Sequence, residues 1–295
     1  MKKIFLLMSL LFIFVGTKSI SLNAIAESSV TKDKSESSIL SDSNFDDVFK
    51  DIRGCAVIFD KQENKYYFYN NDMAQKRVSP YSTFKIVATL LGLQNGIIKD
   101  EQSKMNYSGT EYPLDVWNEN LSLSSAFKFS CIWYFRQIID AIGKNTVEKE
   151  LNELSYGNCN VSEWNGSNIN PMLDLNGFWL NSSLQISPFE QVNILAKLFE
   201  GQSIYSTDNI KILKNIMFIA DDGTNQIYGK TGTGLDGKAW FIGFKEHGDK
   251  RKYIAVYLDA PDKKENINGQ LAKEIALMMF PKTNTVDINL ENIIK

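Results

Sequence analysis

Two short Ser-x-x-Lys sequences could each place a nucleophile beside a base. On a helix, residues three apart lie on the same face, so the serine hydroxyl can reach the lysine amine. A serine needs a base to take its proton, and a buried lysine can serve because desolvation disfavours its ammonium form. The pattern arises readily by chance, so its surroundings must decide. The chain offers Ser82-Thr83-Phe84-Lys85 and Ser125-Ala126-Phe127-Lys128.

The surroundings favour Ser82 and Lys85 as the reactive pair. Pro80 precedes an apolar stretch, residues 84–93, that ends at an Asn-Gly pair, as a buried helix does. Lys85 is therefore expected to be buried. Lys128 belongs to a more polar amphipathic segment, where a solvated surface lysine is expected.

The chain contains only one histidine, which removes the usual catalytic bases and metal ligands. A His-rich metal centre cannot be built, and a Ser-His-Asp triad would depend on His247 alone. His247 lies in a polar, Gly-containing turn between two apolar runs, where a solvated hairpin position is expected. No metal site is predicted, because the Asp221-Asp222 pair lacks a third ligand and suits a solvated turn.

Nucleotide and nucleic-acid binding are disfavoured. Gly229-Lys230-Thr231 resembles the end of a P-loop, but the glycine required earlier in that motif is replaced by Thr224, and the segment that follows leads toward a strand. The chain has 32 Lys and Arg against 35 Asp and Glu, a net charge of −3, and no basic stripe. Its 295 residues, 43% hydrophobic and 23% charged, have an ordinary globular composition.

Hydrophobic periodicity indicates strands near both ends of the chain and helices between them. Strands at both ends with a helical middle predict an α/β part made from both termini and a helical insertion at about 97–200. The expected strands cover residues 54–59, 66–69, 227–230, 240–244 and 253–258, and the expected helices cover 84–93, 122–142, 188–199 and 268–279.

Residues 1–26 have the pattern of a secretory signal peptide. Lys2 and Lys3 precede an apolar run, residues 4–15, which is shorter than the roughly 20 residues of a transmembrane helix. Ala24-Ile25-Ala26 supplies a small-residue cleavage site. We expect cleavage after Ala26 and a protein secreted or held in the cell envelope without a stable membrane span. An uncleaved anchor is the alternative.

The rest of the chain is expected to be one catalytic domain, residues 45–295. Residues 27–44 are rich in Ser, Lys and Asp and have few apolar positions, which indicates a flexible tether. The cysteines are odd in number and widely spaced, so buried free thiols are expected rather than a disulfide framework. They are Cys55, Cys131 and Cys159.

Further motifs follow Ser82-x-x-Lys85 in a fixed order. Taken together and at these separations, they resemble the class D serine β-lactamases, the oxacillinase type, and the related penicillin-sensing receptor domains, over most of the chain. Lys-Thr-Gly also occurs across penicillin-binding proteins, and the discriminating motif is Ser-x-Ile, where class D has Ser-x-Val. The motifs are Ser130-Cys131-Ile132, Tyr156-Gly157-Asn158, Gly177-Phe178-Trp179-Leu180 and Lys230-Thr231-Gly232.

The resemblance implies a fold of the penicillin-binding transpeptidase type, with an antiparallel sheet flanked by helices and an inserted all-helical subdomain. It implies hydrolysis of a small-molecule β-lactam through an acyl-enzyme on Ser82. Ser130 would relay a proton to the leaving nitrogen. Lys230 and Thr231, followed by Gly232, would hold the substrate carboxylate.

Two further features are implied by the same resemblance. The backbone N–H groups of Ser82 and Thr233 would form the oxyanion hole. Lys85 would be carboxylated by carbon dioxide, and the carbamate, held in a pocket with Ile132 and Trp179, would act as general base. No other cofactor is implied, and the oligomeric state is not indicated.

Three departures from the family pattern affect these expectations. Ile132 adds a methylene to the wall beside the lysine, which should be tolerated. A second tryptophan, Trp164, competes with Trp179 as the carbamate partner; we prefer Trp179, because Leu184-x-Ile186-Ser187 follows it as in the family. The last helix lacks the arginine that binds the substrate carboxylate in many class D enzymes.

The alternative function is a penicillin-binding sensor or carrier that is acylated once and holds the adduct. Full receptors of this kind carry several membrane spans and a zinc protease, and the sequence contains no His-Glu-x-x-His motif. A cell-wall transpeptidase is a third possibility. Turnover separates these functions.

Overall fold

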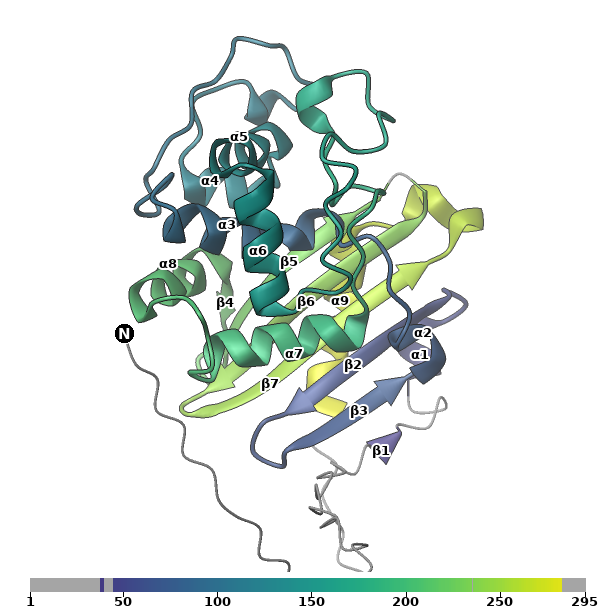
Figure 1. Ribbon diagram of the computed structural model, residues 1–295. Coiled ribbons are helices and arrows are strands. Elements are labelled where there is room, and N and C mark those ends of the chain that lie inside the picture. The colour runs from purple at the N-terminus through teal and green to yellow at the C-terminus, as the bar shows by residue number, and fades with distance from the viewer. Residues whose placement is uncertain (1–37, 40–44, 235, 283–295) are drawn as a thin grey trace, which may run out of the picture. The chain divides into compact units, whose positions relative to one another are not determined.

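A computed structural model describes residues 38–39, 45–234 and 236–282 (Figure 1). The predicted signal peptide, residues 1–26, lies outside the described residues, and so does most of the predicted tether. Within the described part of the chain, no helix is long and apolar enough to cross a membrane.

The described strands form one seven-stranded sheet in the order β1-β3-β2-β7-β6-β5-β4. Every neighbouring pair is antiparallel except β1 with β3, which is parallel, so the predicted antiparallel sheet is confirmed for the other six strands. The strands are β1 Ser38–Ile39, β2 Gly54–Asp60, β3 Lys65–Tyr69, β4 Phe218–Asp221, β5 Gln226–Thr233, β6 Lys238–His247 and β7 Lys250–Asp259.

The short strand β1 lies within the segment predicted to be a flexible tether, residues 27–44. Ser38 pairs with Tyr67 and Ile39 with Phe68 at the edge of the sheet. The other residues of the segment lie outside the described residues, so the tether stays a prediction.

Both faces of the sheet are covered, which explains its continuous apolar strands. Along β2, Val57 and Phe59 point into the core beneath the helical part, whereas Ala56 and Ile58 point into a second core. The second core contains α1 (Asp46–Phe49) and α9 (Gly269–Lys282). Figure 1 shows α7 in front of the sheet and α9 behind it.

The helical part contains six helices between β3 and β4 besides the short α2 (Asn71–Ala74). Helix α7 matches its predicted range and begins with a capping box between Ser187 and Glu190 and with Pro188 in its first turn. The six helices are α3 Lys85–Gln94, α4 Leu123–Lys128, α5 Ile132–Ile142, α6 Lys144–Leu154, α7 Pro188–Phe199 and α8 Thr207–Met217, with 3-10 turns at Tyr81–Phe84, Asp115–Trp117 and Leu173–Leu175. A further 3-10 turn, Pro261–Asn266, follows β7.

The helix predicted over residues 122–142 is interrupted. Ser130 adopts a left-handed backbone conformation with φ of 54°, and the chain therefore leaves α4 and restarts as α5 at Ile132. A non-glycine residue in this region costs about 1–2 kcal/mol, so the surrounding contacts must hold Ser130 in place.

The Tyr156-Gly157-Asn158 turn ties the end of α6 to the segment that leads into α7. The Asn158 side chain accepts a hydrogen bond from the Gln185 N–H (2.9 Å) and donates one to the Ser183 carbonyl (2.8 Å). Gly157 has φ of +58°, and a Cβ there would lie 2.0 Å from the Gln185 carbonyl oxygen. Only glycine fits this turn.

We expect Gly157→Ala to destabilise the protein by more than its left-handed conformation alone requires. Gly96 also has a positive φ, +68°, but a Cβ there meets nothing within 4 Å. Gly96→Ala should therefore cost about 1–2 kcal/mol, and Gly157→Ala about 1–3 kcal/mol more, because backbone must move. Urea unfolding of both variants measures the difference. Equal losses would show that the turn can shift freely.

Candidate active site

Ser82 and Lys85 meet where a 3-10 turn runs into α3. Lys85 is the first residue of α3, and its Nζ donates a hydrogen bond to the Ser82 Oγ at 2.8 Å. The Lys85 side chain is fully buried and its Nζ lies 5.6 Å from the centre of the Phe135 ring. Burial lowers the pKa of Lys85 to about 7. A large fraction of this amine is therefore neutral near pH 7 and able to accept a proton.

Ser130 and Lys230 form a second pair of the same chemical type. Ser130 lies between α4 and α5, and the Lys230 Nζ on β5 donates hydrogen bonds to the Ser130 Oγ and, at 3.0 Å, to the Thr231 carbonyl. Lys230 is 5% exposed. Burial, and then the positive charge of Lys85, holds the pKa of Lys230 well below its usual range. The two serine–lysine pairs therefore belong to one site.

One face of β5 places Lys230, and with it Ser130, next to the turn that carries Ser82. Residues alternate between the two faces of a strand, so Lys230 and Gly232 share the face that meets the Ser82 turn. A Cβ on Gly232 would lie 3.4 Å from the Ser82 backbone nitrogen. The strand and the nucleophile turn are therefore in direct contact.

Thr233 lies at the end of β5 next to this contact. Its hydroxyl oxygen accepts a hydrogen bond from the Gly269 N–H at the start of α9, at 2.9 Å. The side chain thus belongs to the opposite face from Gly232. This bond anchors the end of the strand, and with it the backbone that was predicted to share an oxyanion hole with Ser82.

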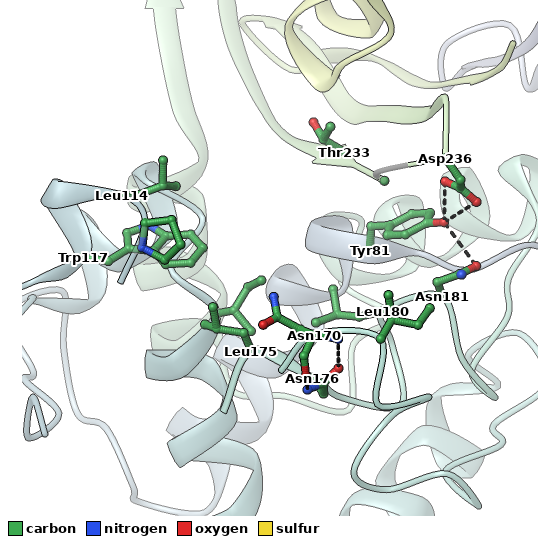
Figure 2. A pocket seen from close by; sticks show the side chains of 14 residues that line it. Tyr81, Leu114, Trp117, Asn170, Leu175, Asn176, Leu180, Asn181, Thr233 and Asp236 are labelled. Carbon is green, nitrogen blue, oxygen red and sulfur yellow. Dashed lines mark hydrogen bonds between the residues drawn. The ribbon is translucent and has the colours of Figure 1, made fainter. Parts of the chain in front are cut away.

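A cavity of about 450 Å³ opens beside the nucleophile turn (Figure 2). Its walls are mostly apolar, and two of the residues around it, Leu114 and Ile169, remain strongly exposed. Ile132 and Thr233, both predicted site residues, line it. Its apolar side comprises Leu114, Trp117, Ile132, Ile169, Leu175 and Leu180.

Lys230 and Thr231 line a separate groove of about 500 Å³, which also contains Lys128 and Lys273. Strand β4 pairs with β5 only as far as Tyr228. From Gly229 onward, no described strand pairs with this edge of β5. The groove therefore offers cationic side chains and free backbone to a ligand.

The two tryptophans have different surroundings. Trp179 is fully buried, stacks on Phe84 at 5.4 Å between ring centres, and its indole N–H has no hydrogen-bond partner among the described residues. Trp164 is only partly buried and donates its N–H to Asp140 at 3.0 Å. The buried N–H of Trp179 therefore has no partner of its own among the described residues, whereas Trp164 anchors its loop through Asp140.

The other candidate nucleophile and bases from the sequence lie away from Ser82. Ser125 is the third residue of α4, where its N–H donates to the N-cap Ser122, and Lys128 is exposed. His247 is exposed at the far end of β6. Eight residues of strand, about 27 Å, separate it from Ala239, the residue paired with Thr233. Neither the Ser125–Lys128 pair nor His247 can assist Ser82.

The cysteine prediction is correct in part. All three are free thiols, and Cys55 and Cys131 are buried. Cys159 is only half-buried, because it lies in the turn after Tyr156-Gly157-Asn158 with a left-handed backbone, φ of 52°.

Three residues near the nucleophile carried no motif. Tyr81, directly before Ser82, donates its phenol hydrogen bond to Asp236 and lies close to the Asn181 side chain. Asn181 and Asp236 lie 100 and 155 residues from Tyr81 in the sequence, so no short motif connects the three residues. The adjacency of Tyr81 to Ser82 was the only available signal.

Comparisons with known proteins agree with this geometry. Residues 54–278 match the family model described as the penicillin binding protein transpeptidase domain. The protein named "Probable beta-lactamase YbxI" of Bacillus subtilis is 35% identical over 239 residues, which cover 80% of this chain and 85% of that protein. Regulatory protein BlaR1 of Bacillus licheniformis is 33% identical over 274 residues, but the match spans 43% of its length.

Solved structures give the same result. A class D β-lactamase from Bacillus subtilis superposes with a TM-score of 0.73 and 34% identity, covering 82% of this chain and 97% of that one. The C-terminal domain of the Bacillus licheniformis BlaR penicillin-receptor superposes with a TM-score of 0.74 and 32% identity, covering 84% and 96%.

The chain therefore belongs to the penicillin-binding transpeptidase family. Within that family it groups with the class D serine β-lactamases and the penicillin-receptor domains, which confirms the resemblance and the predicted fold class.

The lowered pKa of Lys85 predicts a pH dependence of stability. Between pH 7 and 9 the unfolded chain keeps a proton on this amine that the folded chain has lost, so folding becomes more favourable as pH rises. Relative to Lys85→Met in carbon dioxide-free buffer, the parent's free energy of unfolding should rise by about 1.4 kcal/mol per pH unit.

Urea unfolding at several pH values measures this slope. Lys128→Met, which removes an exposed lysine, is the control and should run parallel to the parent. A Lys85→Met curve that is also parallel would contradict the neutral buried amine.

Proposed function

We propose that the protein hydrolyses β-lactams through an acyl-enzyme on Ser82. The observation that carries the proposal is the pairing of Ser82 with the fully buried Lys85, next to a second pair in which the buried Lys230 contacts the partly buried Ser130. A serine hydroxyl next to a neutral amine has both the nucleophile and the base that acyl transfer needs. The named activities of the relatives support β-lactams as the substrate class.

Acylation forms one bond and breaks another. The Ser82 Oγ attacks the lactam carbonyl carbon while its proton passes to the lysine side chain beside it. The ring C–N bond then breaks, and the leaving nitrogen takes a proton from the Ser130 hydroxyl. The bound substrate carboxylate would favour the ammonium form of Lys230, which contacts the Ser130 Oγ and can replace that proton.

The negative charge that forms on the lactam oxygen needs fixed donors. The backbone N–H groups of Ser82 and Thr233 are suited to this, because β5 and the nucleophile turn are in contact at Gly232. The substrate carboxylate would bind at Lys230 and Thr231, whose groove holds two more lysines. Hydrolysis is completed when a water molecule attacks the ester and Ser82 is released.

We propose further that Lys85 is carboxylated on Nζ. The residues fit such a group: a neutral buried amine is the form that reacts with carbon dioxide, and the buried Trp179 N–H has no partner of its own. When bound, the carbamate supplies an anionic base beside Ser82. Trp179 and the Ser82 hydroxyl would hold it.

A sensor function is the second candidate. The receptor domain of Bacillus licheniformis BlaR is as similar in structure to this chain as the hydrolytic relative is, with TM-scores of 0.74 and 0.73. Both functions require acylation of Ser82, and only the enzyme requires rapid release of the adduct.

Export remains part of the proposal, and it rests on the Lys2-Lys3 start, the apolar run and the Ala24-x-Ala26 site.

Brief exposure to benzylpenicillin should add one adduct, and peptide mapping should place it on Ser82. Ser82→Ala should abolish the adduct, while Ser125→Ala, the matched change in the other Ser-x-x-Lys sequence, should leave it unchanged. Intact-mass spectrometry measures both. An adduct that survives in Ser82→Ala would overturn the assignment. Hydrolysis of a chromogenic cephalosporin beyond one equivalent separates the enzyme from the sensor.

Trp179→Phe should weaken the carbamate, because it removes one buried hydrogen bond worth about 1–3 kcal/mol and keeps an aromatic ring in place. Carbon-13 NMR with labelled bicarbonate measures carbamate occupancy directly, and turnover with and without bicarbonate measures its effect. Acidification should release the carbamate from parent and variant, and Trp164→Phe should behave like the parent.

Bicarbonate dependence confined to Trp164→Phe would mean that the other tryptophan is the partner. No labelled carbamate in the parent would refute carboxylation.

A further inference from the structure

Tyr81, the residue before the nucleophile, is held in a conformation that its side chain disfavours. Its φ is +48°, in the left-handed region that bulky residues rarely adopt. Such a residue costs about 1–3 kcal/mol and persists only where surrounding contacts impose it. The contacts that impose it here are therefore informative about the turn that carries Ser82.

Three kinds of contact hold Tyr81. Its backbone N–H donates to the Trp179 carbonyl at 3.0 Å. Its ring is 4% exposed and packs on Gly234, where a Cβ would lie 2.7 Å from the ring carbon that bears the hydroxyl. Its hydroxyl reaches Asp236, with 3.1 and 3.3 Å to the two carboxylate oxygens.

The Tyr81 hydroxyl has only one proton to donate, and a carboxylate is the stronger acceptor. Asn181 lies farther away, at 3.4 Å. Burial, and then the negative charge of Asp236, raises the pKa of Tyr81 well above its usual range, so the phenol keeps this proton. The Tyr81–Asp236 bond is thus a fixed, charge-assisted link (Figure 2).

The link joins the two backbones predicted to bind the oxyanion. Tyr81 is adjacent to Ser82, and Asp236 lies in the connection from β5 to β6, just beyond Thr233. That connection is braced from its other side, because Asp236 forms an ion pair with Lys238 and the Gly234 N–H donates to the Lys238 carbonyl at 2.8 Å. Movement of either backbone would stretch the link.

We propose that the Tyr81–Asp236 hydrogen bond is a positioning device that sets the separation of the Ser82 and Thr233 backbone N–H groups. Tyr81 and Asp236 are positioning residues: they act through these amides. The inference rests on the proposed acylation of Ser82. It requires that the link lower the barrier to acylation without changing how tightly the substrate first binds, because the oxyanion forms only as the reaction proceeds.

The test compares Tyr81→Phe, which removes one hydroxyl, with Asp236→Ala and Asp236→Asn. Rapid-quench mass spectrometry with benzylpenicillin gives the acylation rate constant and the dissociation constant of the first complex. Tyr81→Phe and Asp236→Ala should each slow acylation about tenfold, as expected for loss of one hydrogen bond to a charged group. The dissociation constant should change less than twofold. Asp236→Asn keeps an acceptor oxygen and should recover most of the rate.

Phenylboronic acid gives a second readout, because its adduct with a serine is tetrahedral like the reaction intermediate. Its affinity should fall by about the same factor as the acylation rate in Tyr81→Phe. The double variant Tyr81→Phe/Asp236→Ala should be no slower than either single variant. The matched control is Tyr66→Phe on β3, which removes a phenol hydroxyl that donates to Asn193 on α7.

Parent-like acylation and boronate affinity in Tyr81→Phe would overturn the proposal, and so would additive losses in the double variant or an equal loss in Tyr66→Phe. The outcome is separable from the proposed function. Absence of a Ser82 adduct in the parent refutes that function, whereas a parent that acylates normally beside an unaffected Tyr81→Phe refutes only the positioning role.

Discussion

The desolvation of the Lys85 amine is the constraint on which the rest of the site depends. An ammonium group at this position would lose its water and gain no carboxylate partner in the described structure, so the neutral form is favoured. Burial also disfavours the ammonium form of Lys230, and the positive charge of Lys85 disfavours it further. The aromatic rings beneath the two amines, Phe135 and Phe127, supply the apolar surroundings. The basicity of the Lys85 amine and its proximity to Ser82 therefore depend on packing as much as on residue type.

The sheet positions the remaining groups of the site around Ser82 and Lys85. Strand β5 carries Lys230 toward the core and then Gly232, and Gly234 follows directly after the strand, where the nucleophile turn must approach its backbone. Gly232 lets the strand contact the turn at Ser82, and Gly234 makes room for the Tyr81 ring. Because β5 pairs with β6 through Thr233, and α9 bonds the Thr233 hydroxyl, the strand end is held from two sides. In the proposed function, the same strand would bind a substrate, orient it and limit the space open to it.

The sequence predicted the parts of the site whose contacts are local. Ser82 and Lys85 lie three residues apart at the start of an apolar helix, and both spacing and burial can be read from neighbouring residues. The hydrogen bond from Tyr81 to Asp236 joins residues 155 positions apart, so hydrophobic periodicity and short motifs in the sequence do not reveal it. The break between α4 and α5 was missed because the left-handed conformation of Ser130 is imposed by tertiary contacts. Strand β4 is short and mostly exposed, so it lacked the alternation that marked the other strands.

The open edge of β5 has a consequence for solubility. Free backbone groups along a strand edge can pair with a second copy of the same strand and begin aggregation. Here the edge beyond Tyr228 must stay uncovered if it is to receive a ligand, so it cannot be capped by another strand. The groove beside it contains Lys128, Lys230 and Lys273 and no acidic side chain among its described lining residues. Two copies approaching edge to edge would bring the exposed Lys128 and the partly exposed Lys273 of each copy together, so lysines that suit an anionic ligand also discourage self-association.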